Sequence, residues 1–350
     1  MGTVYIMTNS FEGNKVIAFN RRRNGIISLM GCFETCGRGS GVSDVSAEIT
    51  DAGVDPLKSQ YSLINACNKF LFAVNAGNNT VSSFRIADTG VITLADVTDS
   101  YGIRPVSLAF CNNVLYVLNA GAPPNVTGFR INESGWFSRL SSTEPLSAPD
   151  SVPGSVLFSP DGSQLAVTET SYDRISIFNV LDSKKLTRPA INVSHGTGPL
   201  GMDFLGPCIL LVAEEGRNAV SSYKVYINGS LTVISGSVEN GQRGMRRVYI
   251  TPDRRYAYTT DTLSGTISVY HIEKCGVLKY MGSILIDYNN TATFPTDAGI
   301  SPDGKFFYVL NGATGALYAF KIENNGQLNK IQELVWSDVP IPGVQGLAVR

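Results

Sequence analysis

Hydrophobic and polar residues alternate in short runs along the chain, and the clearest example is residues 70–86, FLFAVNAGNNTVSSFRI. The apolar run that starts at Phe70 ends at Asn75, and a second alternating run follows a short polar loop. A period of two residues is typical of a β-strand. The same arrangement recurs in residues 115–131, LYVLNAGAPPNVTGFRI, and 307–322, FYVLNGATGALYAFKI. The pattern predicts a chain of repeated pairs of strands.

Seven copies of this unit can be aligned on the residue that ends the first strand of the pair. These residues are Asn9, Asn75, Asn119, Glu169, Glu214, Asp261 and Asn311. Each copy holds four short runs, which we name strands A to D from the centre outwards, and three copies have a Ser/Thr-Pro-Asp turn between A and B. Repeats of roughly 40–50 residues with four strands each are typical of propeller blades. We therefore predict an all-β fold, a seven-bladed β-propeller with four antiparallel strands per blade.

The two ends of the chain complement each other. Val4–Met7 reads as a strand B with no strand A before it, and Val344–Val349 reads as a strand A with no strand B after it. Pairing the last strand with strands B to D at the N-terminus makes one whole blade and removes exposed sheet edges. Residues 1–350 are therefore predicted to form a single domain.

One insertion, at about residues 37–59, makes the first interval longer than the others. It is rich in Gly, Ser and Asp and has no sustained period, so we predict a loop. It joins strand D of blade 1 to strand A of blade 2, on the face where the B–C connections also gather. Long loops in compact domains are often functional. A lid over the channel mouth and a mobile surface loop are both open interpretations.

Composition narrows the class of partner. The chain has 28 basic and 29 acidic side chains, a net charge of -1 and 43% hydrophobic residues. Nothing in this balance indicates nucleic acid or an anionic membrane surface, and no apolar run reaches the roughly 18 residues of a membrane span. We expect a small-molecule partner that is uncharged or weakly polar. The sequence carries no signal for an oligomeric state.

Cysteines and glycosylation sequons indicate whether the protein is secreted or cytoplasmic. Six cysteines, an even number, fit disulfides in an oxidising compartment, and buried free thiols are the alternative. They are Cys32, Cys36, Cys67, Cys111, Cys208 and Cys275. Candidate glycosylation sites are Asn78, Asn125, Asn132, Asn192, Asn228 and Asn289. We favour secretion after removal of a signal peptide, and the alternative is a cytoplasmic protein.

Several stretches, among them RPVSLAF, VLFSPDGSQLAVTE, ITPDRRYAYTTDTLSGTISVY and ISPDGKFFYVLNGATGALYAF, resemble the lactonase-type seven-bladed propellers. That family includes 6-phosphogluconolactonase and carboxymuconate cyclase. The resemblance implies a site at the channel mouth where strands A begin and strands B end, with an Arg-His pair and a Glu in the phosphogluconolactonase-like members. Here the pair corresponds to Leu200 and Gly201, and the Glu to Glu214 or Glu215. This departure argues against a phosphorylated sugar lactone, whose anion needs cations. His195 can compensate for the missing Arg-His pair only if its loop folds inward.

The same two positions in every blade give a set of candidate channel residues. The catalytic candidates are Glu214, Glu215, Arg104, Arg246 and Tyr61. The substrate-binding candidates are Gln60, Asn75, Asn119, Glu169, Tyr172, Leu200, Asp261, Thr296, Asp297, Asn311 and Gln345. The alternative for the repeated Asn residues is that each caps its own turn. Where an acid replaces Asn, at Glu169, Glu214 and Asp261, function is more strongly indicated. Because neighbours in a strand point oppositely, we expect that Arg246 and Arg247 do not both face the channel.

Other chemistries lack their motifs. No G-x-S-x-G elbow or Gly-rich phosphate loop is present, and the chain has only two histidines. The chain has no C-x-x-C pair, so the sequence does not indicate a zinc site. We therefore predict no cofactor, and allow a structural calcium ion in the channel.

Three functions follow as hypotheses. The favoured one is a cofactor-independent cyclase of natural-product biosynthesis, of the hetero-Diels–Alder type that the resemblance includes among secreted fungal relatives. It would act by orientation and by hydrogen bonds from Tyr61, Arg104 or Arg246. The second is a lactone hydrolase or carboxymuconate-type cycloisomerase that uses Glu214 or Glu215 as general base, with an arginine at the oxyanion. The third is a propeller that binds a ligand or protein without catalysis.

Overall fold

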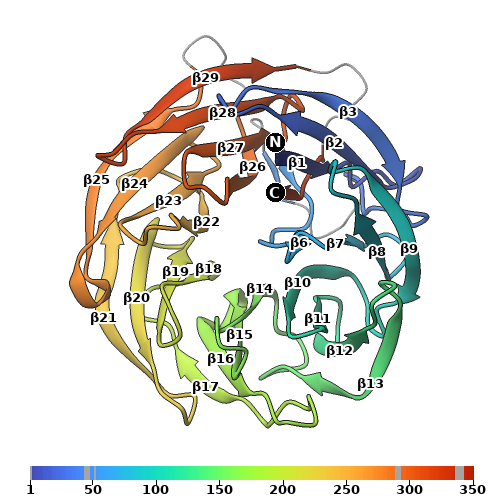
Figure 1. Cartoon of the computed structure of the whole chain (residues 1–350). Coiled ribbons are helices and arrows are strands. Elements are labelled where there is room, and N and C mark those ends of the chain that lie inside the picture. Colours follow the sequence, from blue (N-terminus) through green and yellow to red (C-terminus); the bar gives the residue numbers. More distant parts are fainter. Residues whose placement is uncertain (1, 43–47, 51–52, 288–292, 336–342) are drawn as a thin grey trace.

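A computed structural model describes residues 2–42, 48–50, 53–287, 293–335 and 343–350. In these residues seven four-stranded antiparallel sheets lie around a central channel (Figure 1). The predicted seven-bladed β-propeller is confirmed. Blade 1 contains β1 (Gly2–Met7), β2 (Lys15–Arg21), β3 (Ile27–Glu34) and β30 (Leu347–Val349). Blade 2 contains β6 (Leu63–Ala66), β7 (Phe70–Asn75), β8 (Thr80–Ile86) and β9 (Ile92–Asp99).

The other five blades repeat the pattern, each from inner strand A to outer strand D. Blade 3 contains β10 (Pro105–Cys111), β11 (Val114–Asn119), β12 (Asn125–Ile131) and β13 (Phe137–Pro145). Blade 4 contains β14 (Pro153–Phe158), β15 (Gln164–Glu169), β16 (Arg174–Asn179) and β17 (Ala190–Val193). Blade 5 contains β18 (Pro199–Phe204), β19 (Ile209–Glu214), β20 (Ala219–Val225) and β21 (Leu231–Glu239). Blade 6 contains β22 (Met245–Ile250), β23 (Tyr256–Asp261), β24 (Thr266–Ile272) and β25 (Leu278–Leu285). Blade 7 contains β26 (Pro295–Ile300), β27 (Phe306–Asn311), β28 (Leu317–Ile322) and β29 (Leu328–Leu334).

The ring closes in blade 1 as predicted. β30 pairs antiparallel with β1, with Val4 opposite Val349 and Ile6 opposite Leu347. Residues from opposite ends of the chain thus share one sheet, and the inner edge of β1 is paired along that stretch.

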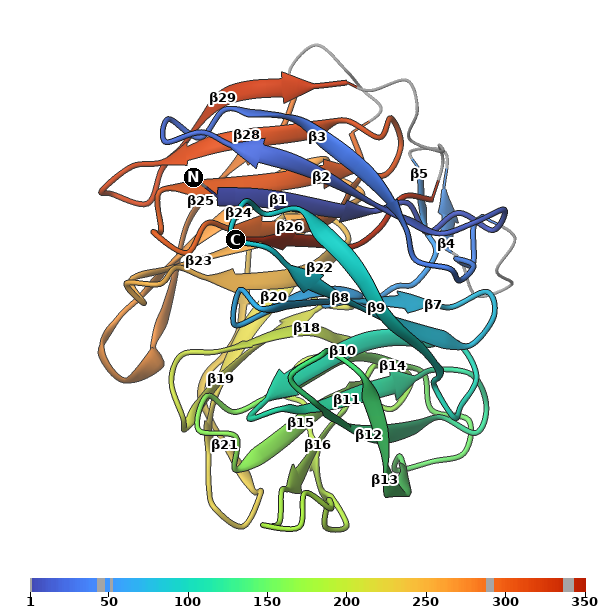
Figure 2. The ribbon, with the colours of Figure 1, turned by 45° about the vertical axis from the view of Figure 1, so that its right-hand side comes forward.

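The two faces of the propeller differ. On one face, which we call the termini face, strands A end and strands B begin, and both chain ends lie there (Figure 1). The Ser/Thr-Pro-Asp turns are on this face. In each, the hydroxyl donates to the Asp carboxylate two residues on, as Thr251 does to Asp253 at 2.6 Å, and accepts from a backbone N–H five residues on. The opposite face, which we call the insertion face, carries β4 (Glu48–Thr50) and β5 (Gly53–Asp55) of the insertion (Figure 2).

The insertion contains a small hairpin, so the prediction of a loop without strands is wrong. β4 (Glu48–Thr50) pairs antiparallel with β5 (Gly53–Asp55). Three residues per strand are too few for an alternating pattern to show in the sequence. Residues 43–47 and 51–52 of the insertion lie outside the described residues.

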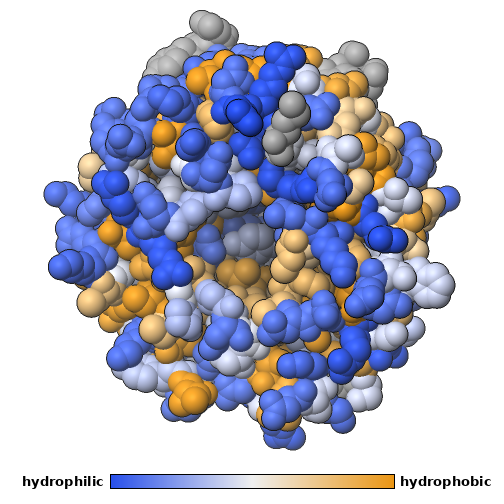
Figure 3. Space-filling model, viewed as in Figure 1, coloured by the Kyte–Doolittle hydropathy of each residue, from blue (hydrophilic) through white to orange (hydrophobic). Residues whose placement is uncertain are grey.

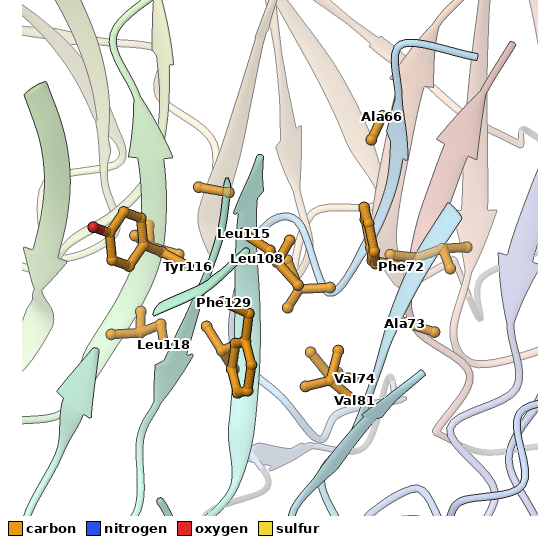
Figure 4. Close-up of a cluster of buried hydrophobic side chains, with 14 of the residues drawn as sticks. Ala66, Phe72, Ala73, Val74, Val81, Leu108, Leu115, Tyr116, Leu118 and Phe129 are labelled. Atoms are coloured by element: carbon orange, nitrogen blue, oxygen red, sulfur yellow. The ribbon is translucent and has the colours of Figure 1, made fainter. Parts of the chain in front are cut away.

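Apolar side chains fill the space between neighbouring blades. Between blades 2 and 3, the ring centroids of Phe72 and Phe110 lie 5.4 Å apart, and Leu108 and Leu115 are buried in the same cluster (Figure 4). Burying a side chain of this size stabilises the fold by about 1.5–3 kcal/mol. These contacts hold the blades in a ring and so fix the positions of the inner strands that line the channel.

Candidate active site in the central channel

The insertion places a carboxylate inside the channel. Asp55, the last residue of β5, accepts a hydrogen bond from Arg246 Nη1 at 3.2 Å and from Arg247 Nη2 at 3.1 Å. All three side chains are fully buried. Burial alone raises the pKa of Asp55, but attraction to Arg247 and Arg246 outweighs it and the pKa is lowered. The structure thus holds Asp55 as an ionised partner of two arginines.

Both arginines of β22 reach the channel, so the expectation that Arg246 and Arg247 point oppositely is wrong. The register between β22 and β23 shifts between Met245 and Arg247, which is a β-bulge. A bulge inserts one unpaired residue and breaks the alternation of side chains. Corresponding shifts occur at the start of β10, β14, β18 and β26, so the bulge is a feature of most of the inner strands.

Glu215, rather than Glu214, joins this group of charges. Its Oε1 lies 3.0 Å from Arg246 Nη2 and its Oε2 lies 2.9 Å from Lys58 Nζ. The side chains of Glu215 and Lys58 are 18% and 29% exposed, whereas Asp55 and both arginines are not exposed at all. We call Asp55, Lys58, Glu215, Arg246 and Arg247 the channel ion cluster. Solvent reaches it from the side of Glu215 and Lys58.

Two predicted substrate-binding amides hold the channel together instead. Gln60 Nε2 donates to the carbonyl of Val248 at 2.8 Å across the channel. Gln345 Oε1 accepts from the Leu57 N–H at 3.0 Å, and its Nε2 donates to the Ser59 carbonyl at 3.2 Å. Both side chains are buried. Their polar groups position the end of the insertion, which in turn positions Asp55 and Lys58.

The three acids that replace Asn at strand ends serve loops of their own blades. Glu214 accepts from Ser237 Oγ at 2.7 Å and from the Gly196 N–H at 2.9 Å. Glu169 accepts from Ser147, Ser151 and Ser176. Asp261 accepts from Asn240, Thr266 and Ser268. All three carboxylates are buried. These acids are therefore loop caps, away from the channel ion cluster.

The predicted asparagines have the same capping role. Asn75 Nδ2 donates to Ser82 Oγ at 2.8 Å, and Asn119 Nδ2 donates to the Ser100 carbonyl at 3.1 Å. Asn311 Oδ1 accepts from the Phe294 and Ala313 N–H groups, both at 3.0 Å. An amide side chain can satisfy backbone groups in this way because it mimics a peptide.

Three further candidates lie around the mouth on the insertion face. Arg104 Nη2 donates to the Pro56 carbonyl at 3.0 Å, and Thr296 Oγ1 donates to the Val344 carbonyl at 3.0 Å. Tyr172 is 38% exposed and donates to Asp150 at 2.8 Å, so it is a rim residue. His195 is exposed and bonds Ser237 of outer strand β21 through Nδ1 at 2.9 Å, so its loop does not fold inward.

Deeper in the channel, Asp297 links the ion cluster to the termini face. Its Oδ1 accepts from Tyr249 Oη at 2.7 Å and lies 4.0 Å from Arg247 Nε, and its Oδ2 accepts from the Leu347 N–H. Burial raises the pKa of Asp297 to about 6, against the opposing effect of Arg247. Tyr61 spans the same level and donates to the Met202 carbonyl at 2.9 Å.

Sequence reasoning missed Asp55 and Lys58 entirely. Both lie in the insertion, which has no counterpart in the other blades, so comparison between repeats could not single them out. A lone Asp-Pro-Leu-Lys stretch just before an inner strand was the only signal available.

Among the described residues, no group of three or more His, Cys, Asp or Glu side chains could hold a metal ion. No ligand set for the calcium ion allowed above can therefore be named from them. A search of the described part of the chain for a helix long and apolar enough to cross a membrane found none.

The chain and its fold can be compared with those of known proteins. The family model described as lactonase, 7-bladed beta-propeller, matches residues 29–232 and 207–340. The chain belongs to this lactonase propeller family. The 6-phosphogluconolactonase of Serratia proteamaculans (strain 568) is 21% identical over 273 residues, 74% of this chain and 78% of that protein. The one from Yersinia pseudotuberculosis serotype O:3 (strain YPIII) is 22% identical over 265 residues, 72% and 77% of the two chains.

Solved structures agree on the fold. The periplasmic gluconolactonase of Pseudomonas aeruginosa has a TM-score of 0.75 at 17% identity, covering 99% of this chain and 98% of that one. A protein from Lactobacillus plantarum has a TM-score of 0.73 at 16% identity, covering 100% and 98%. At such identities the likeness concerns the fold alone.

This lactonase-family propeller packs closely where the resemblance places an Arg-His pair. Leu200 is fully buried. A Cβ atom built on Gly201 would lie 2.4 Å from Gln60 Oε1 and 2.5 Å from the Arg246 carbonyl oxygen. A side chain as large as His therefore has no room at position 201 in this channel.

The cysteines differ from both expectations. None of the six forms a disulfide; five are exposed and Cys111 is partly buried, so neither disulfides nor buried thiols are found. Among the sequons, Asn78, Asn132 and Asn228 are exposed, and Asn125 is partly buried. The amide of Asn192 donates to the Gly229 carbonyl at 3.0 Å. Asn289 lies outside the described residues.

Proposed function

We propose that this propeller is a lactone hydrolase that acts at the channel ion cluster. The observation that carries this proposal is Glu215, a partly exposed carboxylate held between Arg246 and Lys58 at the mouth where strands A begin. The family and the gluconolactonase names of its relatives support hydrolysis rather than the ring-forming cyclisation favoured from the sequence.

In the proposed reaction Glu215 is the general base for a water molecule. The water oxygen adds to the lactone carbonyl, the ring C–O bond breaks, and the proton taken from water passes to the departing alkoxide. Arg246 and Lys58 donate hydrogen bonds to the oxygen on which negative charge develops. The product is the open hydroxy acid. Water alone is the co-reactant.

The pairing of the charges in the cluster, rather than their sum, favours an uncharged lactone. Three cations face two carboxylates, and Asp55 already occupies the inner side of both arginines. A phosphate group would need cations that are not committed in this way. The Arg-His pair implied by the resemblance is replaced by Leu200 and Gly201. We therefore propose a small neutral lactone as substrate, rather than 6-phosphogluconolactone.

The test compares hydrolysis of glucono-1,5-lactone with that of its 6-phosphate by acid release at constant pH, corrected for the spontaneous reaction. We expect a higher kcat/KM for the uncharged lactone. Glu215→Gln should lower kcat/KM by at least about 100-fold, since a positioned general base contributes about 10²–10⁴-fold. Glu169→Gln is the matched control, because Glu169 is a buried cap in the neighbouring blade and should leave kcat/KM within about twofold. A folded Glu215→Gln protein with undiminished activity would overturn the proposal.

A further inference from the structure

The termini face has a cavity that the proposed hydrolysis does not use. It has a volume of about 550 Å³ and opens at the end of the channel opposite to Glu215 and Lys58. Figure 3 shows the hollow at the centre of this face. Its walls come from inner strands and are mainly apolar: Leu63, Leu108, Leu157, Ile250, Ile300 and Leu347. A cavity of this size and character is typical of small-molecule sites.

One carboxylate in this cavity lacks a cation. Asp203 of β18 is part of the cavity wall and partly exposed to it. Its Oδ2 accepts from the Ile250 N–H and its Oδ1 from the Phe204 N–H, both at 2.9 Å. Among the ion pairs of the described residues, none includes Asp203. Each carboxylate oxygen has a further lone pair available to a donor.

The groups around Asp203 add no positive charge to the cavity wall. The other titratable side chains that line the cavity are Tyr61, Cys67, Tyr249 and Asp297. Burial raises the pKa of both tyrosines well above its ordinary value, so they are neutral at physiological pH. Arg247 Nε lies 4.0 Å from Asp297 Oδ1 and its side chain is fully buried, and the described residues that line the cavity include no Lys or Arg. The cavity wall is thus mainly apolar, with two carboxyl groups and the aromatic rings of Tyr61, Phe110 and Tyr249.

We propose that this cavity binds an organic amine, with the protonated amino group on Asp203 and a compact apolar body against the walls. An ammonium group pairs with a carboxylate and is also attracted to aromatic faces such as that of Tyr61. An organic anion is disfavoured by the two carboxyl groups. A neutral ligand leaves Asp203 without a cationic partner.

Protonation of Asp203 gives the proposal a pH signature. Burial raises the pKa of Asp203 to about 7 and that of Asp297 to about 6. An ammonium ligand binds the ionised form, so its apparent affinity scales with the ionised fraction of Asp203. Between pH 8 and pH 6 this fraction falls about tenfold, and protonation of Asp297 acts in the same direction. The affinity of a neutral ligand has no such dependence.

The experiment measures binding of benzylamine and of benzyl alcohol, its uncharged counterpart, by calorimetry on the full chain. At pH 8 benzylamine should bind at least about tenfold more tightly than benzyl alcohol. The affinity for benzylamine should fall about tenfold at pH 6, while that for the alcohol stays constant. In Asp203→Asn most of the preference for benzylamine should be lost, because the amide carries no charge. The variant should fold, since the amide oxygen can still accept the backbone N–H of Ile250. Ile64→Trp, which narrows the cavity, should weaken both.

Three results would overturn the proposal. One is equal affinity of the wild-type protein for the two ligands at pH 8, or no binding of either at 20 mM. The second is a preference for benzylamine that Asp203→Asn and low pH leave unchanged. The third is unchanged binding in the folded Ile64→Trp variant, which would place the site elsewhere. If Asp203→Asn does not fold, the pH series on the wild-type protein decides alone.

Discussion

Arg247 Nη2 donates to both carboxylate oxygens of Asp55 at 3.1 Å, although 192 residues separate the two in sequence. The contact joins the insertion to inner strand β22 and occurs where neither side chain is exposed. A buried ion pair of this kind fixes geometry more than it adds stability, but removing one partner leaves a buried charge without compensation. Asp55 therefore controls both the stability of the channel and the charge that a substrate meets there.

We expect Asp55→Asn to destabilise the protein by roughly 3–5 kcal/mol, because Arg246 and Arg247 then share one neutral acceptor. Urea unfolding at pH 7 measures this. Inorganic phosphate at millimolar concentration should restore part of the loss in the variant by binding the arginines, and should do little for the wild-type protein. Asp88→Asn, at an exposed position, is the control and should change stability by less than about 0.5 kcal/mol. Equal stability of the Asp55 variant and the wild type would contradict the prediction.

The repeat could be predicted from sequence because packing between blades imposes the same alternation of hydrophobic and polar residues on the strands of all seven blades. The inner strands, the Ser/Thr-Pro-Asp turns and the closure by β30 followed from that pattern. The site did not follow. Asp55 comes from a segment without a repeat, and the bulge at Met245–Arg247 cancels the rule that neighbouring residues point oppositely. Capping also misled: Glu214 and Asp261 deviate from the Asn pattern but hold loops as Asn does.

We expect Gly201→Ala to destabilise the propeller by about 1–3 kcal/mol, since its Cβ would clash with Gln60 and with the backbone of Arg246. Gly13→Ala is the matched control: its Cβ would meet only a Glu34 oxygen, at 4.0 Å. The control should change stability by less than about 0.5 kcal/mol. Thermal and urea unfolding of both variants check this. A Gly201→Ala protein as stable as the control would show that the channel has room for a larger side chain.

Because none of the six cysteines forms a disulfide, we expect that a reducing agent has no effect on stability. Unfolding in urea with and without dithiothreitol should give the same midpoint. A thiol reagent added to the native protein should modify the five exposed cysteines before Cys111. Burial raises the pKa of the Cys111 thiol, which lowers its thiolate fraction and slows its reaction. A midpoint that falls in dithiothreitol would indicate a disulfide and contradict the structure.

The raised pKa of Asp261 predicts how the stability of the protein depends on pH. Burial raises its pKa to about 6, although Ser268, Thr266 and Asn240 donate hydrogen bonds to it. The ordinary value is 3.8, so between about pH 4 and pH 6 the folded state binds more protons than the unfolded state. The stabilisation that Asp261 contributes to the folded state is thus fully present below about pH 4 and is lost as pH rises through about 6. A difference of about two pKa units corresponds to roughly 3 kcal/mol.

Asp261→Asn should remove that part of the pH dependence. The neutral amide, the residue that blades 1, 2, 3 and 7 use at this position, cannot ionise, so the fall in stability from pH 4 to pH 7 should be smaller in the variant by roughly 2–3 kcal/mol. Urea unfolding at pH 4, 5, 6 and 7 measures the two slopes. Asp88→Asn, exposed and outside the caps, should reproduce the wild-type slope. Parallel curves for Asp261→Asn and the wild type would mean that Asp261 keeps its ordinary pKa in the folded protein, and that the hydrogen bonds from Ser268, Thr266 and Asn240 fully offset its burial.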